Sequence, residues 1–207
     1  MAQSPLDAAL SELGLELAPE TRQQLLDLVV LVERWATRIN LTGHRGPEGV
    51  LRGLVLDALA LERVLPGCET LLDLGSGAGF PGLPIAVVRS QECRVTLLDS
   101  RQRRNHFQRA AIRELRLHNV NTLLGRSEAL DPTGHEIVLA QALAQPLRAI
   151  DLMRRWVAPG GRIALAVSQP PDPAQLKESG IAESEVRSYR VPVTGRDRVL
   201  WIGKLEA

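Results

Sequence analysis

The sequence predicts an α/β fold in which a seven-stranded, mostly parallel sheet carries an N-terminal helical extension. Three observations support this prediction. From about residue 69, short apolar segments alternate with helical ones, which is the pattern of a parallel sheet with crossover helices. The first 65 residues instead place apolar side chains at helical spacing. The last two apolar segments follow one another without a helix between them, which indicates an antiparallel pair.

Length and composition are those of one globular domain. The chain has 207 residues, of which 44% are hydrophobic and 24% charged. We expect residues 1–67 to form a helical segment packed on a core domain of residues 68–207. The start has no basic stretch followed by an apolar one, and no run approaches the length of a membrane span. We therefore expect a cytoplasmic protein that avoids membranes. We also expect it to be a monomer.

The N-terminal extension reads as a series of helices between residues 5 and 65. In the segment 20–43, Leu25, Leu28 and Val32 begin an apolar stripe with steps of three and four residues. Gly43 and the pair Gly46-Pro47 interrupt the pattern, and a further helix is predicted over about 49–65, where Pro66-Gly67 ends it.

Seven strands are predicted after this extension. Five belong to the parallel part of the sheet, and two form the terminal pair. The helices between them begin near Pro81, Arg101, Pro146 and Pro173. The strands cover about residues 70–75, 94–100, 121–125, 136–141, 161–168, 184–193 and 198–206.

A glycine-rich loop, LGSGAGFPG, follows the first strand and precedes a helix. Such a loop turns backbone N–H groups toward a ligand and needs glycine for close approach. From Gly77 it matches the G-x-G-x-x-G dinucleotide pattern; from Asp73 it reads as an acid followed by Gly75, Gly77 and Gly79. We prefer the second register because the strand ends at Gly75, which leaves no strand directly before Gly77.

Asp99 ends the second strand, where a carboxylate can accept hydrogen bonds from both hydroxyls of a ribose. This acid suits any adenosine cofactor and does not by itself separate S-adenosylmethionine from NAD. With the loop in the register from Asp73, the combination resembles the class I S-adenosylmethionine-dependent methyltransferases, which have a Rossmann-like fold. The resemblance implies S-adenosylmethionine as the cofactor.

The two cysteines, Cys68 and Cys93, lie at expected strand starts and lack the clustering that a metal site or a disulfide framework would need. We expect free, buried thiols and no metal. Pyrimidine C5 methylation needs a cysteine nucleophile near the cofactor, and these cysteines precede their strands. The segment AQALAQP after the fourth strand also lacks the Asn or Asp with two prolines that accompanies methylation of base amino groups.

A ring nitrogen such as guanine N7 is a different acceptor because it presents a lone pair and carries no proton. Attack on a sulfonium methyl then requires mainly alignment, so proximity and orientation can supply much of the acceleration. A site without an obvious acid or base is compatible with this chemistry. We therefore name no catalytic residue.

Several segments together resemble the RsmG (GidB) family. They are FPGLPIAVV after the glycine loop, the TLLDS strand, NLT at residues 40–42, GRSEAL at 125–130 and the closing RVLWIGK. The resemblance implies N7-guanine methylation in 16S ribosomal RNA, with that RNA or the small ribosomal subunit as partner. It also implies cofactor contacts from Gly75 and Phe80, from Ser127 and Glu128 near the adenine, and from position 141.

Three departures from the family pattern fall where methyl donor and RNA should meet. Gln141 stands where the family has arginine, and Val167 or Ser168 stands where it has lysine. The histidine of a family Arg-His-x-x-Asp-Ser segment is missing from residues 52–58. Loss of two cations removes phosphate contacts without changing the cofactor pocket. With 25 Lys and Arg against 24 Asp and Glu, any RNA binding depends on local patches.

The RNA contacts we expect are Asn40, Arg52, Arg101, Arg103 and Arg104. Asn40 can equally be a helix terminus. Three later arginines, Arg109, Arg113 and Arg116, are expected on one helical face, which we interpret as solvated. Three functions stay open: methylation of ribosomal RNA, which leads; methylation of another acceptor by a divergent relative; and a non-catalytic module that binds cofactor and RNA.

Overall fold

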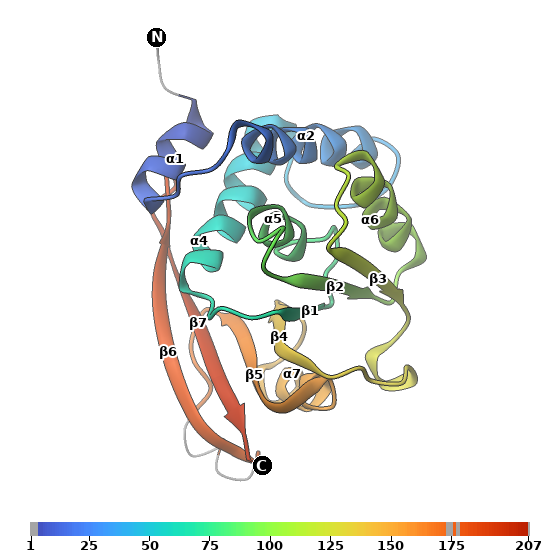
Figure 1. Cartoon of the computed structure of the whole chain (residues 1–207), viewed down its shortest axis with the longest axis vertical. Coiled ribbons are helices and arrows are strands. Elements are labelled where there is room, and N and C mark those ends of the chain that lie inside the picture. The colour runs from blue at the N-terminus through green and yellow to red at the C-terminus, as the bar shows by residue number, and fades with distance from the viewer. Residues whose placement is uncertain (1–3, 173–175, 177–178, 207) are drawn as a thin grey trace.

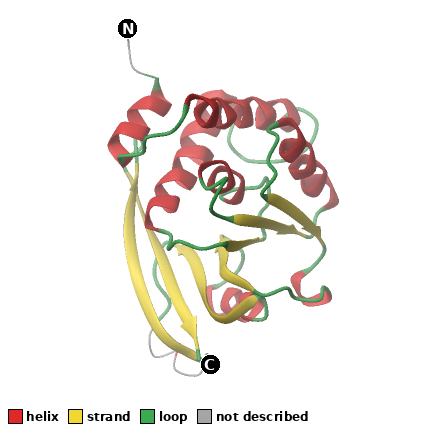
Figure 2. Cartoon of the chain, in the orientation of Figure 1, coloured by secondary structure: helices red, strands yellow, loops and turns green. Residues whose placement is uncertain are grey.

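The structure is a computed structural model that describes residues 4–172, 176 and 179–206. A single seven-stranded sheet, ordered β3-β2-β1-β4-β5-β7-β6, forms its centre. Figure 2 shows this sheet with helices against both of its faces. The predicted α/β class is therefore confirmed.

The strands occupy the segments that the apolar pattern predicted, with some longer than expected. β1 to β5 are mutually parallel, and β7 runs antiparallel to both β5 and β6. The bounds are β1 Thr70–Leu74, β2 Arg94–Asp99, β3 Val120–Leu124, β4 His135–Gln141, β5 Val157–Val167, β6 Ile181–Val191 and β7 Arg196–Leu205.

Strand alternation divides the core between the two faces of the sheet. On β1, Leu71 faces the larger apolar cluster, which holds side chains of the N-terminal helices, whereas Leu72 and Leu74 face the smaller one. The smaller cluster includes buried side chains of α7 (Pro146–Arg154) and the fully buried Trp156. On the larger side lie α5 (Gly82–Val88) and α6 (Gln102–Glu114), as Figure 1 shows. A short 3₁₀ turn, Ser127–Ala129, follows β3 and contacts α7 through the ion pair of Glu128 with Arg148.

The N-terminal helices cover the α5–α6 side of the sheet. α1 (Pro5–Leu13) and α2 (Pro19–Ala36) each begin with proline, which is favoured in the first turn. Buried leucines of both helices join the larger cluster with α5 and α6, and Figure 1 shows α2 lying over α5 and α6. The helical character of residues 5–65 is confirmed, whereas the domain boundary at residue 67 stays a prediction.

The predicted helix over residues 49–65 is broken by a π-helical turn. The segment consists of α3 (Gly46–Val50), a π turn (Leu51–Val55) and α4 (Leu56–Val64). The imidazole of His44 lies where a side chain at Gly53 would project, with its ring atoms about 2.2 Å from an ideal Cβ. Only glycine leaves room for the ring at this point, and nothing in the periodicity indicates this contact.

Three further predictions concern a helix near Pro173, the position of Arg116 and membrane spans. The helix expected near Pro173 begins outside the described residues. Arg116 lies beyond the end of α6 at a positive φ of 55°, so its predicted place on one face with Arg109 and Arg113 is wrong. Among the described residues, we find no helix with the length and apolar character of a membrane span.

Candidate cofactor and acceptor site

The carboxyl ends of β1 to β5 meet at one edge of the sheet, and two cavities open there. The first, of about 370 Å³, lies at the ends of β1, β2 and β3, and Gly75, Asp99 and Ser127 line it. The chain order reverses beside β1, since β2 lies on one side and β4 on the other. Ligands of open α/β sheets bind at such a reversal.

The glycine loop is fastened to the neighbouring strand. The N–H groups of Gly75 and Ser76 both donate to the carbonyl oxygen of Leu98, at 2.8 and 3.0 Å. Gly75 has a φ of 76°, and an added Cβ would lie 2.6 Å from Cδ1 of Leu143. Glycine is therefore required where the strand turns into the cavity wall.

Gln108 of α6 supports the loop from the protein interior. Its Nε2 donates to Oγ of Ser76 at 2.9 Å and to the carbonyl oxygen of Gly77 at 2.8 Å. The residue is fully buried. These bonds hold the first half of the loop against the helix, so Gln108 is a positioning residue for the cavity.

Asp73 faces away from the cavity. Its carboxylate accepts a hydrogen bond of 2.9 Å from the N–H of Gly82, the first residue of α5. Burial raises the pKa of Asp73 to about 7, against the effect of the Gly82 hydrogen bond, and the nearby charge of Asp99 adds to the increase. Asp73 thus joins β1 to α5 and does not line the cavity.

Asp99 is the centre of the hydrogen-bond network at the first cavity. Its Oδ1 accepts from the N–H of Arg101 at 2.8 Å, and Oδ2 accepts from the N–H of Gly77 at 2.9 Å. The guanidinium of Arg104 lies 3.3 Å from Oδ2. A carboxylate has about four acceptor positions, so one is left for a further donor. A second donor would take the place of Arg104, whose side chain is 28% exposed.

Ser127 and Glu128 form the far wall of the first cavity, on the 3₁₀ turn after β3. The hydroxyl of Ser127 donates to Oε2 of Glu128 at 2.9 Å, and Arg148 lies 3.4 Å from Oε1. Hydrogen bonds from its own backbone and from Ser127 lower the pKa of Glu128. The wall therefore offers a carboxylate that stays ionised near neutral pH.

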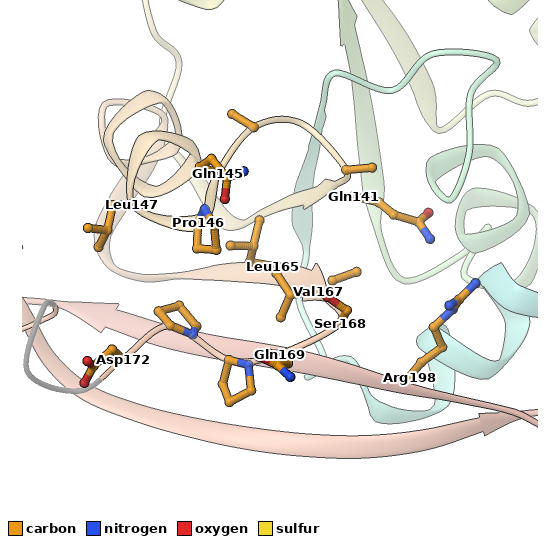
Figure 3. Close-up of a pocket in the computed structure, with 15 residues that line it drawn as sticks. Gln141, Gln145, Pro146, Leu147, Leu165, Val167, Ser168, Gln169, Asp172 and Arg198 are labelled. Carbon is orange, nitrogen blue, oxygen red and sulfur yellow. The ribbon is translucent and has the colours of Figure 1, made fainter.

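The second cavity is a groove of about 690 Å³ beside the first, at the ends of β4 and β5. Gln141, the last residue of β4, and Arg198 of β7 both line it, and Figure 3 shows their side chains extending toward the same end. Ala142 lines both cavities. Its φ of 52° is costly for a residue with a Cβ, so the backbone between the two cavities is strained.

Arg198 is the one basic side chain among the described residues that line the groove. Its Nη2 lies 3.3 Å from Oδ2 of Asp57 on α4, whose side chain is only 10% exposed. Tyr189, directly across from Arg198 in the sheet, completes this group. Burial and the charge of Asp57 raise the pKa of Tyr189. Asp57 therefore holds a guanidinium that lines the groove.

The structure divides the predicted site residues into groups. Gly75, Asp99, Ser127 and Glu128 line the first cavity together with Arg101 and Arg104. Gln141 lines the groove instead. The remaining predicted residues line neither of these two cavities. They are Asp73, Gly77, Gly79, Phe80, Asn40, Arg52 and Arg103.

These remaining residues have other surroundings. Phe80 packs against the larger apolar cluster, and Arg52 pairs with Glu48 at 2.6 Å. Asn40 is exposed and lies beyond the end of α2 at Ala36, so it does not cap that helix. Contacts of these residues with cofactor or RNA stay predictions.

Sequence reasoning missed Gln108 and Arg198. A glutamine within an arginine-rich helix carries no signal of burial. Arg198 opens the segment RVLWIGK, which contributed to the resemblance, but only the pairing of β7 with β5 brings it to the end of β4.

Solved structures of methyltransferases share this fold. A SAM-dependent methyltransferase from Aquifex aeolicus matches with a TM-score of 0.55 and 18% identity, over 75% of this chain and 92% of that one. The M. jannaschii protein TYW2, solved in complex with AdoMet, matches with a TM-score of 0.60 and 16% identity, over 83% and 80%. The sheet and the loop at its edge thus define a class I methyltransferase fold.

The sequence narrows this class to one family. The family model GidB, rRNA small subunit methyltransferase G, matches residues 21–200. A protein named ribosomal RNA small subunit methyltransferase G from Chromohalobacter salexigens is 34% identical over 96% of this chain and 95% of its own length. One of the same name from Myxococcus xanthus is 33% identical over 95% and 94%. The chain belongs to this family.

Proposed function

We propose that this protein transfers a methyl group from S-adenosylmethionine to N7 of a guanine in 16S ribosomal RNA. The observation that carries the proposal is the pair of adjacent cavities at one sheet edge, separated by Ala142. One has the features of a nucleoside site, and the other is an open groove lined by the cation of Arg198. Membership of the small-subunit rRNA methyltransferase G family supports both the reaction and the substrate.

The residues of the first cavity fit an adenosine cofactor. The carboxylate of Asp99 has acceptor capacity for a ribose hydroxyl, and Gly75 allows close approach of the backbone. Leu98, Leu143 and Leu152 supply apolar surface for a base. We propose that Ser127 and Glu128 lie at the adenine end, and that Asp73 acts indirectly by holding α5.

S-adenosylmethionine, when bound, supplies a methyl group on a positively charged sulfur. The chain's task is to align the acceptor with that methyl group and to exclude competing nucleophiles. Guanine N7 attacks with its lone pair and has no proton to lose, so the site needs no general base. The groove provides a carboxamide at Gln141 and a guanidinium at Arg198 to orient the acceptor.

We propose that Arg198 supplies the positive charge that Gln141, Val167 and Ser168 lack. All four residues line the same groove, so a phosphate or guanine O6 that enters it meets Arg198. Arg101 and Arg104 at the first cavity, together with Arg126, extend the cationic border. Asn40, Arg52 and Arg103 are proposed as outer contacts to the RNA.

The test is methyl transfer to small ribosomal subunits from cells that lack this gene. Purified chain and S-adenosylmethionine with a labelled methyl group should produce one labelled N7-methylguanine in 16S RNA, identified by nuclease digestion and mass spectrometry. Label on another nucleoside, or none on either subunits or naked 16S RNA, would overturn the proposal. In the absence of transfer, cofactor binding by calorimetry would distinguish a non-catalytic binding module from an inactive preparation.

An Arg198→Gln variant tests the acceptor side alone. We expect methyl transfer to fall by about ten- to a hundredfold, because a charge-assisted contact is lost, while cofactor affinity stays unchanged. The double variant Asp57→Asn with Arg198→Gln avoids an unpaired buried carboxylate, and Arg196→Gln on the same strand is the exposed control.

We also propose that the protein acts as a monomer in the cytoplasm. Light scattering tests the oligomeric state, and cell fractionation tests the location.

A further inference from the structure

The two cysteines lie together at the amino-terminal edge of the sheet, opposite the cavities. Cys68 precedes β1 and Cys93 precedes β2, and these neighbouring parallel strands place Thr70 opposite Arg94. The sulfur atoms are 3.5 Å apart, although the residues are 25 positions apart in sequence. Both thiols are free. The two cysteines are therefore neighbours in the folded protein, although they are not clustered in the sequence.

The two thiols differ in accessibility. Cys68 is half-buried in the segment between α4 and β1, whereas Cys93 is 2% exposed within the larger apolar cluster. Asn119 holds the backbone at Cys93, since its Nδ2 donates to the carbonyl oxygens of Cys93 and Ala86 at 2.9 and 3.0 Å. A reagent in solution therefore meets Cys68 first, and Cys93 is held behind it.

A buried cation lies beside the accessible thiol. Nη1 of Arg89 is 4.0 Å from the sulfur of Cys68 and donates to the carbonyl oxygen of Pro66 at 2.9 Å. Its Nε pairs with Oε1 of Glu62 at 2.9 Å, and the whole residue is 8% exposed. The guanidinium thus has a fixed position beside the sulfur.

The local charges favour the thiolate of Cys68. The hydrogen bond with Cys93 lowers the pKa of the Cys68 thiol, and Arg89 adds to this effect, while partial burial and Glu136 oppose it. The hydrogen bond with Cys68 and burial raise the pKa of Cys93. Since the thiolate is the nucleophile, we expect Cys68 to attack an external disulfide first and Cys93 to react in a second step.

We propose that Cys68 and Cys93 form a reversible oxidation site for low-molecular-weight disulfides such as glutathione disulfide. The Cys68 thiolate attacks one sulfur of the disulfide, which forms a mixed disulfide and releases a glutathione thiolate. Cys93 then attacks the sulfur of Cys68, its proton passes to solvent, and the second glutathione leaves as a thiolate. Two protein thiols become one protein disulfide, and one glutathione disulfide becomes two glutathione molecules once solvent protons are taken up.

The cross-link would join the chain that leaves α4 to the start of β2. The glycine loop and Asp99 lie at the opposite ends of β1 and β2, so oxidation should leave the cofactor cavity intact. A disulfide between Cys68 and Cys93 would restrict the conformations of the unfolded chain. It should therefore raise Tm by on the order of 5–10 °C. The site is independent of the proposed methyl transfer, and its test requires no methyl acceptor.

The experiment treats the reduced full-length chain with glutathione disulfide, blocks remaining thiols with iodoacetamide and measures the intact mass. The wild type should lose two hydrogen atoms and gain no blocking group, and dithiothreitol should reverse this change. Cys93→Ser should instead retain one glutathione on Cys68. Cys68→Ser should stay unmodified over the same period, because Cys93 is buried.

Three results would overturn the proposal. They are a wild type in which iodoacetamide blocks one or both thiols, a Cys68→Ser variant that acquires glutathione as fast as Cys93→Ser, and a disulfide that links two chains. Circular dichroism and thermal unfolding of both serine variants verify that they are folded. A rise in Tm of the oxidised wild type that neither serine variant shows would support the internal cross-link.

Discussion

Single residues at the carboxyl edge of the sheet divide into those that face the cavities and those that hold them. Asp99 and Asp73 illustrate the difference, since both are buried carboxylates at the ends of neighbouring strands. Asp99 lines the first cavity and accepts from two backbone N–H groups. Asp73 accepts from Gly82 inside the fold. Their substitutions should therefore affect different properties.

Asp99→Asn should weaken S-adenosylmethionine binding by about ten- to a hundredfold, because one charged acceptor for the ribose is lost. Isothermal titration calorimetry measures the affinity, and thermal unfolding reports the loss of the Gly77 and Arg101 contacts separately. Asp131→Asn, an exposed carboxylate outside the cavities, is the control. A folded Asp99→Asn variant with wild-type affinity would place the ribose elsewhere.

Asp73 should make stability depend on pH. Burial raises its pKa in the folded protein from an ordinary 3.8 to about 7. Between about pH 4 and 7 the folded state therefore holds a proton that the unfolded chain has lost. This contribution to the free energy of unfolding is complete below about pH 4 and disappears as pH rises through 7.

The measurement for Asp73 is urea unfolding of the wild type and Asp73→Asn between pH 5 and 8. The wild type should lose about 2–4 kcal/mol relative to the variant across this range, since asparagine keeps an acceptor for Gly82 but cannot ionise. Equal pH profiles for the two proteins would show that Asp73 titrates normally.

Among the structural elements, α6 supports the cofactor cavity, although the most visible feature of its sequence is its many arginines. The helix contributes Gln108 beneath the loop and Arg104 beside Asp99, whereas Arg109 and Arg113 are exposed. The interpretation of these two as a solvated face stays a prediction. The π turn before α4 is another element-level feature, and its Gly53 leaves room for the imidazole of His44.

Gln108→Leu should lower the free energy of unfolding by about 1–3 kcal/mol, because Ser76 and Gly77 lose a buried donor. The loosened loop should also weaken cofactor binding several-fold. Chemical unfolding and calorimetry measure the two effects. Gln102→Leu, at the exposed start of the same helix, is the matched control. A Gln108→Leu variant with the control's stability and affinity would remove Gln108 from its positioning role.

At the scale of the whole molecule, positive and negative charges nearly balance, so RNA binding depends on local groups of cations. The formal net charge is +1, so no long-range field attracts RNA to the protein. Arg101, Arg104 and Arg126 line the first cavity and Arg198 lines the groove. We propose that these four cations contact the RNA at the carboxyl edge of the sheet.

RNA binding should therefore show a modest salt dependence. Three or four phosphate contacts to single-stranded RNA predict a slope of log K against log salt of about −2 to −3. Fluorescence anisotropy with a labelled 16S fragment measures this slope across a potassium chloride series. Arg101→Gln should reduce its magnitude by about 0.7, while Arg109→Gln should leave it unchanged. A reduction by Arg109→Gln would instead extend the binding surface along α6.

The sequence by itself determined the α/β class, the seven strands, the glycine loop and the acid at Asp99. These depend on local periodicity and on turn residues, which act over a few neighbouring positions. Tertiary structure alone decided that Asp73 faces Gly82, that Arg198 lines the same groove as Gln141, and that Cys68 meets Cys93. Each of these contacts joins different elements, because strand order and helix packing bring together residues that are distant in the chain.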